Sequence, residues 1–299
     1  MSDATQRYAP ALQGYLPFVL LLFLLATSVC AIAAENEGIW HKSQDFPVEM
    51  IGTWQVSKVR IDKGATRKTL YEWDDPRLLG RILKISHEAI QSDLPEDRQC
   101  LQPKALFRQM DLSPMIQVTL PGMYERTAAE AVADYELPLN LKRPASVAWI
   151  SCSKGSFGPE LLESWAKKLS LPEVHSWLIN NDKDKFALLW YDQTVLLLER
   201  IANGQKTRPS FACTMARSIT EQALCQSISL ASFDASIAQA YKLVLKNHCE
   251  GVSGCRSQQQ KKQAAWAKKR DQCGADAQCL TDAMRSRLEQ LMVIQSSAL

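Results

Sequence analysis

"KFALLWYDQTVLLLERI" runs from Lys185 to Ile201, and Asp192 and Gln193 separate its two apolar segments. Each segment has the length and composition of a β-strand. A two-residue polar connection between two such segments is typical of a tight hairpin. The stretch therefore predicts two antiparallel strands that turn at Asp192–Gln193.

Further strands are predicted on the N-terminal side of this hairpin. "IGTWQVSKVRID" (residues 51–62) alternates and is rich in β-branched residues. Other candidate strands are "GRILKIS" (80–86), "MIQVTL" (115–120), "SVAWISC" (146–152) and "HSWLIN" (175–180). Short strands spaced in this way predict a small closed barrel or a sandwich. Two short helices are predicted at residues 127–137 and 159–169, with Pro159 near the start of the second, where its missing N–H costs nothing.

The C-terminal part predicts helices instead. Single apolar stripes follow helical spacing in two segments, and each stripe needs a packing partner to cover it. The residues of these stripes are Phe233, Ile237, Tyr241 and Val244 in one segment, and Leu280, Met284, Leu288 and Leu291 in the other. Short loops between such helices favour antiparallel packing.

A change in composition and charge separates the two parts. "NGQKTRPS" (residues 203–210) has the Gly, Pro and polar content of a linker. Residues 35–204 contain 21 basic and 24 acidic residues, a net charge of −3, whereas residues 205–299 contain 13 and 7, a net charge of +6. We therefore expect a β domain over residues 35–203, a linker over 204–210 and a helical domain over 211–295.

The N-terminal segment has the layout of a secretory signal peptide. An apolar run from Tyr15 ends in small residues at Ala31, Ala33 and Ala34, and polar residues follow. We expect residues 1–34 to be removed, which makes the product periplasmic or secreted. Two alternatives stay open. The run is long enough to serve as an uncleaved membrane anchor, and Cys30 is a candidate for lipid attachment, although Val29 stands where the lipid-attachment motif has a small residue.

The cysteines agree with export. Eight of the nine lie outside the signal segment, two before residue 205 and six after it, so each part can pair its own cysteines. They are Cys100, Cys152, Cys213, Cys225, Cys249, Cys255, Cys273 and Cys279. A zinc site is the competing interpretation, but no CxxC motif occurs and only His248 lies near the six C-terminal cysteines. We expect no metal and no cofactor.

A longer pattern runs through about 85 residues of the C-terminal part, beginning at "FACTMARSITEQALC" and ending at "QCGADAQCLTDAMRSRLEQL". It consists of the order and spacing of Cys213, Glu221, Cys225, Leu230, Asp234, Tyr241, Gln263, Trp266, Arg270, Asp271, Cys273, Cys279 and Arg287. With these residues the C-terminal part resembles the LprI-like lysozyme-inhibitor domain family of bacterial exported proteins. The resemblance implies a disulfide-linked helical bundle, and the founding activity of the family is binding and inhibition of lysozyme. Phe233 replaces a more usual leucine, and Cys249 and Cys255 look like a local addition.

The disulfide pairing follows from proximity and from this resemblance together. Sequence alone does not choose among the possible pairings of six cysteines. Near neighbours are brought together by helices and tight loops, and the resemblance points the same way. We expect Cys100–Cys152, Cys213–Cys225, Cys249–Cys255 and Cys273–Cys279.

The N-terminal part shows a shorter resemblance. Gly52-Thr53-Trp54 opens the first predicted strand, and Arg200 lies near the end of the last. This is similar to the lipocalin pattern, in which such a tryptophan packs beneath the barrel against a late arginine. The resemblance implies a closed barrel that is able to hold a small apolar ligand. The alternative is a barrel filled by its own side chains. The expected fold is thus multidomain α+β, with a small lipocalin-like barrel followed by a disulfide-linked helical bundle.

Gln263, Trp266 and Arg270 are spaced to share one helix face. Lysines 261, 262, 268 and 269 fall on a different face, which we expect to be solvated. A nucleic-acid site would place an exposed aromatic among the bases, so we expect no nucleic-acid partner. A guanidinium near the buried side needs a carboxylate, and Glu221 and Asp234 are the candidates for Arg270.

No catalytic pattern is evident in the sequence. It contains neither a G-x-S-x-G elbow nor an H-E-x-x-H helix nor a Gly-rich phosphate loop. The acidic residues Glu72, Asp74 and Asp75 are expected to lie in a solvated loop. We therefore expect a non-enzymatic binding protein of the bacterial envelope that acts on lysozyme or another cell-wall lytic enzyme. The alternatives are a lipocalin-like carrier of a small apolar ligand and an envelope structural or stress factor.

Overall fold

The computed structural model describes residues 46, 48–96, 99–122, 126–159, 167–169 and 176–296. All of them belong to one compact unit that spans His41–Leu299. The predicted signal peptide and most of the helix predicted at residues 159–169 lie outside the described residues. The division into two domains with a linker stays a prediction.

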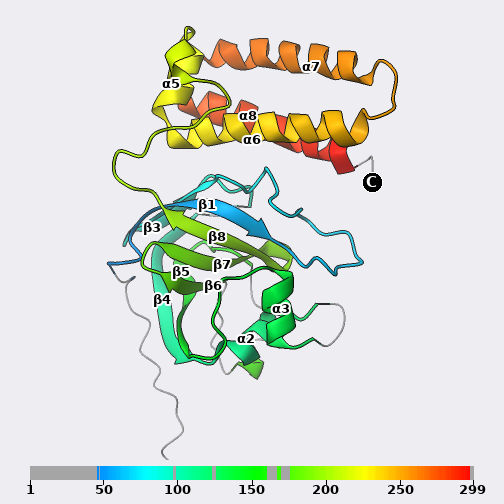
Figure 1. Cartoon of the computed structure of the whole chain (residues 1–299). Coiled ribbons are helices and arrows are strands. Elements are labelled where there is room, and N and C mark those ends of the chain that lie inside the picture. The colour runs from blue at the N-terminus through cyan, green and yellow to red at the C-terminus, as the bar shows by residue number, and fades with distance from the viewer. Residues whose placement is uncertain are drawn as a thin grey trace, which may run out of the picture. The chain divides into compact units, whose positions relative to one another are not determined.

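Eight antiparallel strands close into a barrel in chain order, so the last strand pairs with the first (Figure 1). An α+β fold with a closed barrel was expected, and the structure confirms it. The strands are β1 (Gly52–Arg60), β2 (Ile82–Ile85), β3 (Ala89–Ser92), β4 (Cys100–Met110), β5 (Ala145–Lys154), β6 (Ser176–Asp182), β7 (Lys185–Trp190) and β8 (Thr194–Arg200).

The β7–β8 hairpin forms where the sequence predicted it. A single turn over Tyr191–Gln193 joins the strands, and Trp190 pairs with Thr194 at its base. Asp192 and Gln193 both have positive φ angles, of 57° and 59°. Aspartate tolerates this backbone conformation better than β-branched residues do. The Asp192 carboxylate also accepts a hydrogen bond of 2.7 Å from the Leu70 backbone N–H, which fixes the turn.

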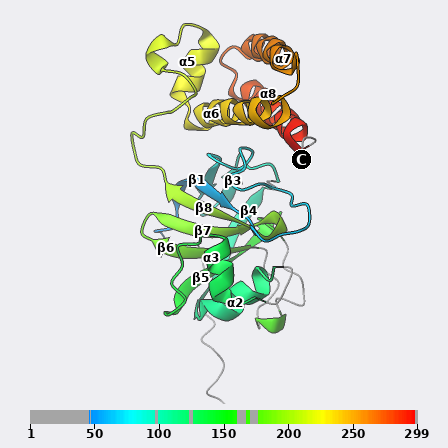
Figure 2. The same cartoon turned by 45° about the vertical axis from the view of Figure 1, so that its right-hand side comes forward.

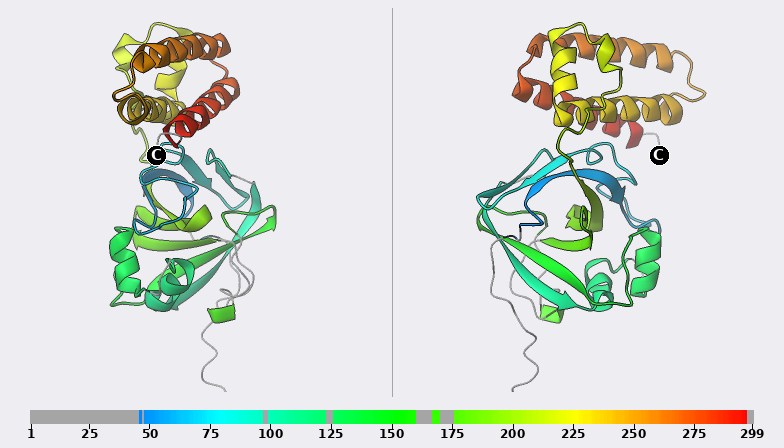
Figure 3. Two further views of the ribbon diagram at one scale, coloured as in Figure 1. Left: turned by 90° about the vertical axis from the view of Figure 1, so that its right-hand side faces the viewer. Right: turned by 60° about the vertical axis from the view of Figure 1, so that its left-hand side comes forward.

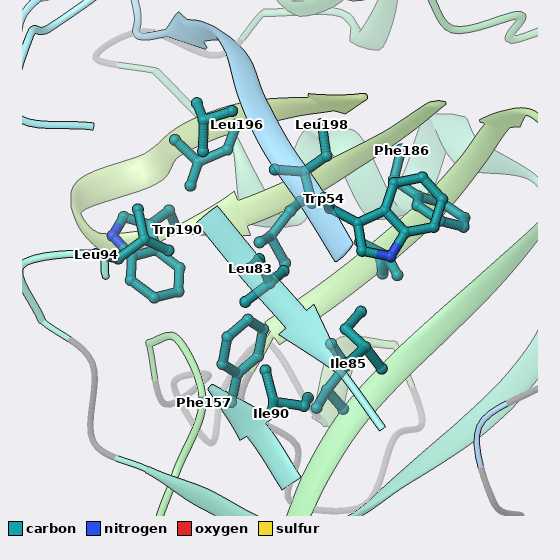
Figure 4. Close-up of a cluster of buried hydrophobic side chains, with 14 of the residues drawn as sticks. Trp54, Leu83, Ile85, Ile90, Leu94, Phe157, Phe186, Trp190, Leu196 and Leu198 are labelled. Atoms are coloured by element: carbon teal, nitrogen blue, oxygen red, sulfur yellow. The ribbon is translucent and has the colours of Figure 1, made fainter. Parts of the chain in front are cut away.

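Alternation along β7 gives the barrel two buried faces. Phe186, Leu188 and Trp190 point into the barrel, where Phe186 contacts Trp54 with a ring-centroid distance of 4.4 Å (Figure 4). Ala187 and Leu189 face outward and are nevertheless buried. Both faces of this strand are therefore apolar, which explains why β7 and β8 have nearly continuous apolar sequences.

Two helices cover the outward apolar face, α2 (Leu112–Thr119) and α3 (Ala128–Asp134) (Figure 3). The helix at α3 was predicted. The strand predicted at residues 115–120 is wrong, because this segment belongs to α2. Asp111 accepts a hydrogen bond from the Ser113 backbone N–H and caps the helix, and Met115 and Ile116 are buried in the outer core. Capping and burial together override the β-propensity of "MIQVTL".

The C-terminal part contains four α-helices: α5 (Ile219–Gln226), α6 (Ile228–Leu243), α7 (Cys255–Arg270) and α8 (Ala277–Ser296) (Figure 2). Helix α6 continues into a short π-helical turn, Val244–His248. The predicted apolar stripes of α6 and α8 pack against each other around Phe233 and Met284. None of the described helices combines the length and apolar character that a transmembrane span requires.

Four disulfides are present in the described residues, and they are the four pairs expected from the sequence: Cys100–Cys152, Cys213–Cys225, Cys249–Cys255 and Cys273–Cys279. The first joins β4 to β5, where Pro103 pairs with Cys152. The other three lie in the helical part. Their number is consistent with an oxidising compartment outside the cytoplasm.

Candidate functional site

Helix α7 is a polar helix that is held in place at both ends. Of its 16 residues only Cys255 and Gln259 are buried. Cys255 is bonded to Cys249 at the end of the preceding helical segment, and Cys273, just after α7, is bonded to Cys279 in α8. An isolated polar helix of this length is marginally stable in water. The disulfides therefore fix a helix that hydrophobic burial alone would hold weakly.

A groove of about 700 Å³ lies between α7 and α8. Four of its twelve lining residues are basic and none is acidic. The lining residues are Lys262, Ala265, Trp266, Lys269, Arg270, Gln272, Cys273, Cys279, Ala283, Ser286, Arg287 and Gln290. The groove thus combines one aromatic surface, amide and hydroxyl groups, and an excess of positive charge.

Arg270 has the partner and the setting expected from the sequence. Its Nη1 lies 3.4 Å from Asp234 Oδ1, its Nη2 lies 2.8 Å from Asp271 Oδ1, and its guanidinium lies 5.3 Å from the Trp266 ring centroid. Asp234 also accepts a hydrogen bond of 2.7 Å from the Ser210 backbone N–H. Two carboxylates therefore neutralise Arg270.

Glu221 is the alternative partner for Arg270, and it has another role. Its Oε2 accepts hydrogen bonds from the backbone N–H groups of Arg217 and Ser218, and the Ser218 hydroxyl accepts one from the Glu221 N–H. This is a capping box at the start of α5. The backbone donors hold the pKa of Glu221 below its ordinary value of 4.5.

Arg287, which lines the groove, forms a second polar pair with Gln263 of α7. The Nε and Nη2 of Arg287 donate to Gln263 Oε1 at 3.1 and 2.8 Å, and its Nη1 donates to Gln290 Oε1 at 3.3 Å. Arg287 is only 5% exposed, and burial lowers the pKa of its guanidinium. Among the described residues no carboxylate lies within ion-pair distance of it. Arg287 is thus a buried cation whose hydrogen bonds all end on neutral amides.

Trp266 lies between these two arginines. Its ring centroid is 5.3 Å from the guanidinium of Arg270 and 5.8 Å from that of Arg287, and its Nε1 donates to the Ala283 carbonyl at 3.4 Å. The tryptophan is half-buried, as is Tyr241, which packs against the helical core. Lysines 261, 262, 268 and 269 are all exposed, as expected, although Lys262 and Lys269 also line the groove.

Trp54 and Arg200 meet at one end of the barrel. The Arg200 guanidinium lies 4.0 Å from the ring centroid of the fully buried Trp54, and its Nη1 donates to the Ile51 carbonyl at 2.9 Å. A Cβ added at Gly52 would lie 2.5 Å from Arg200 Nη1, and the φ angle of Gly52 is 144°. Glycine is therefore required two residues before Trp54, which explains the Gly-x-Trp spacing.

The acidic segment near residue 74 is not simply solvated, contrary to expectation. Asp75 is fully buried and lies 2.7 Å from Arg77 Nη2, while Asp74 lies 2.8 Å from the buried Arg60. These are structural ion pairs. The described residues contain no group of three or more His, Cys, Asp or Glu side chains placed to hold a metal ion.

Arg287 and Arg81 are both buried, and neither was predicted from the sequence to have a role. Arg287 follows Met284 by three residues, so it lies on the apolar stripe of α8, and a charge on an apolar stripe is the signal that could have drawn attention to it. Arg81 is fully buried over the Phe233 ring, at 3.4 Å from its centroid, and donates to Ser236 Oγ at 3.2 Å. It lies immediately before β2, at the end of the long connection from β1, and this position carries no comparable signal.

The barrel interior is occupied by its own side chains. Trp54, Phe157, Phe186 and Trp190 are all at most 2% exposed and contact one another or their neighbours edge to face (Figure 4). Two further cavities, of about 650 and 750 Å³, are lined by surface residues of the described chain and not by this interior cluster. The groove beside Trp266 remains the candidate site that combines an aromatic surface with unneutralised charge.

Comparison of the chain with protein-family models, with curated proteins and with solved structures finds no match.

Proposed function

We propose that this chain is a non-enzymatic, exported binding protein of the bacterial envelope whose helical part engages a protein partner. The observation that carries the proposal is α7, a polar helix that is largely exposed and linked by disulfides at both ends. Such a surface is pre-organised, so it loses little conformational entropy when a partner binds.

The partner that we propose is a cell-wall lytic enzyme of the lysozyme type. The resemblance of the C-terminal part to LprI-like lysozyme inhibitors supports this choice. The disulfide loop Cys249–Cys255 supplies a contact of the required kind, because Val252 is 56% exposed and lies between two glycines with positive φ angles, Gly251 and Gly254. A constrained loop with an apolar residue at its tip is suited to entering a substrate cleft.

The charge of the helical part predicts how inhibition of a lysozyme should depend on salt concentration. The segment from residue 205 onward has a net charge of +6, and a basic lysozyme would be repelled by it at long range. We expect inhibition of a basic lysozyme to strengthen from low to moderate salt as the repulsion is screened. A neutral or acidic lytic enzyme should show the opposite trend or none.

The test is a cell-wall clearing assay with the mature protein and several lysozyme types at both salt concentrations. We expect Val252→Asp to abolish inhibition, and Val293→Asp, at a 66% exposed valine of α8, to leave it unchanged. N-terminal sequencing of the exported protein should find Ala34 or Glu35 as the first residue. If no lysozyme type is inhibited or retained by the protein while it binds a hydrophobic probe stoichiometrically, the carrier function replaces this proposal.

A further inference from the structure

We infer that the groove between α7 and α8 binds an acidic peptide segment, an activity that is separate from the proposed entry of the Cys249–Cys255 loop into a lytic enzyme. The inference starts from Arg287. This guanidinium is 5% exposed, lines the groove and donates only to amide oxygens of Gln263 and Gln290. A buried cation is costly unless an anion accompanies it.

The hydrogen bonds of Arg287 leave N–H donors for such an anion. Its three donated bonds use fewer N–H groups than a guanidinium offers. A planar carboxylate is the group whose two oxygens match two parallel N–H bonds of a guanidinium. Gln263 holds the Nε side of Arg287 through two of these bonds, so it acts as a positioning residue for the remaining donors.

The rest of the groove adds charge of the same sign. Lys262 and Lys269 are exposed at its rim, and no acidic residue lines it. Arg270 contributes less, because Asp234 and Asp271 already neutralise it. The available positive charge therefore comes from Arg287 at the base of the groove and from two lysines at its edge. This arrangement suits a ligand that carries more than one carboxylate.

The uncharged lining favours a peptide over a phosphate or a nucleic acid. Gln272, Ser286 and Gln290 offer donors and acceptors that match peptide N–H and C=O groups, while Ala265 and Ala283 offer a small apolar surface for a side chain. A nucleic-acid base would need an open aromatic face. The arginines within 5.3 and 5.8 Å of the Trp266 centroid stand in the way of such stacking.

The inference is tested by isothermal titration calorimetry of the mature protein with a blocked acidic tetrapeptide, acetyl-Leu-Glu-Glu-Leu-amide. Its glutamine analogue and inorganic phosphate are titrated in parallel. We expect the acidic peptide to bind about tenfold or more tightly than the analogue, because charge-assisted hydrogen bonds are lost with the carboxylates. Binding should weaken as salt is raised.

Matched variants separate the groove from general surface charge. Lys262→Gln/Lys269→Gln changes two exposed groove residues and should weaken binding about fivefold. Lys261→Gln/Lys268→Gln removes the same charge from exposed positions of α7 that do not line the groove, and it should leave binding unchanged. Arg287→Lys keeps the charge but removes the planar pair of N–H donors that a carboxylate can bind. It should weaken binding of the acidic peptide more than binding of the analogue. Circular dichroism verifies that this variant is folded.

Three results would overturn the inference: no binding of the acidic peptide, equal loss in both lysine pairs, or phosphate that binds as tightly as the peptide and displaces it. The last result would identify a general anion site. Because this titration contains no lytic enzyme, its failure leaves the lysozyme assay unaffected, and failure of that assay leaves the peptide result standing.

Discussion

Replacing Arg200 by alanine should destabilise the barrel more than the exposure of this residue suggests. The Arg200 side chain is 26% exposed, yet it covers the Trp54 ring and donates to the carbonyl oxygens of Ile51 and Glu49. Its Nε lies 2.8 Å from Asp184 Oδ1. One side chain thus ties the segment before β1 to the end of β8.

The magnitude follows from these contacts. A hydrogen bond from a charged donor contributes about 1.5–3 kcal/mol, and a partly desolvated cation–π contact contributes about 0.5–2 kcal/mol. The pair with Asp184 contributes little, because that carboxylate is 55% exposed. The contacts share one side chain and water can replace part of them, so we expect a loss of about 3 kcal/mol for Arg200→Ala. Arg200→Lys should cost about half as much, because the single ammonium group lacks the planar guanidinium geometry that reaches both carbonyls.

Urea unfolding of the disulfide-intact protein, followed by near-ultraviolet circular dichroism, measures this loss. The control is Lys185→Ala, which removes an exposed ion pair with Glu199 on the adjacent strand and should change stability by less than about 0.5 kcal/mol. Gly52→Ala gives an internal check, since its Cβ would approach Arg200 Nη1, so part of its cost should vanish in the Arg200→Ala background. If Arg200→Ala cost no more than Lys185→Ala, the contacts of Arg200 with Trp54 and with the two carbonyls would not stabilise the barrel.

Three further perturbations test the helical part. Arg270→Ala should lower the free energy of unfolding in urea by about 3 kcal/mol, because Asp234 is 7% exposed and loses its cation. If Arg270→Ala cost no more than Lys268→Ala, the ion pair would not stabilise the fold. Glu221→Gln should reduce the free energy of unfolding at neutral pH. The difference in stability between the parent and the variant should shrink as pH falls below 4.5, because the folded-state pKa of Glu221 is lowered and its contribution is lost on protonation. A difference that grows in acid would contradict this prediction. Replacing both Cys249 and Cys255 by serine should cost about 2–3 kcal/mol, and non-reduced peptide mapping of the parent should show this pair linked; a bridge to any other cysteine would disprove it.

Features decided by neighbouring residues could be predicted from the sequence. The hairpin at Asp192–Gln193 depends on turn chemistry and on the apolar runs that flank it. The helices around Phe233 and Met284 follow from apolar spacing, and short separations bring Cys273 to Cys279. Strands β3 and β4 were not predicted. In β4, Pro103 is a signal against a strand, but β4 pairs with β3 only at Cys100 and Leu101, so Pro103 lies where hydrogen bonds are needed on one side alone.

The tertiary structure decided what depends on residues far apart in the chain. The segment around Met115 is helical because a cap and an outer core stabilise it against its β-propensity. Glu221 and Asp234 were equal candidates for Arg270 until folding brought only Asp234 within ion-pair distance. The positive charge of the groove also depends on the tertiary structure, because Arg287 of α8 meets the neutral Gln263 of α7 and no carboxylate of the described residues. Which residues are apolar, charged or available for disulfides can be read from the sequence, whereas burial and the choice of partner depend on packing, because both are set by distances between residues that local periodicity does not contain.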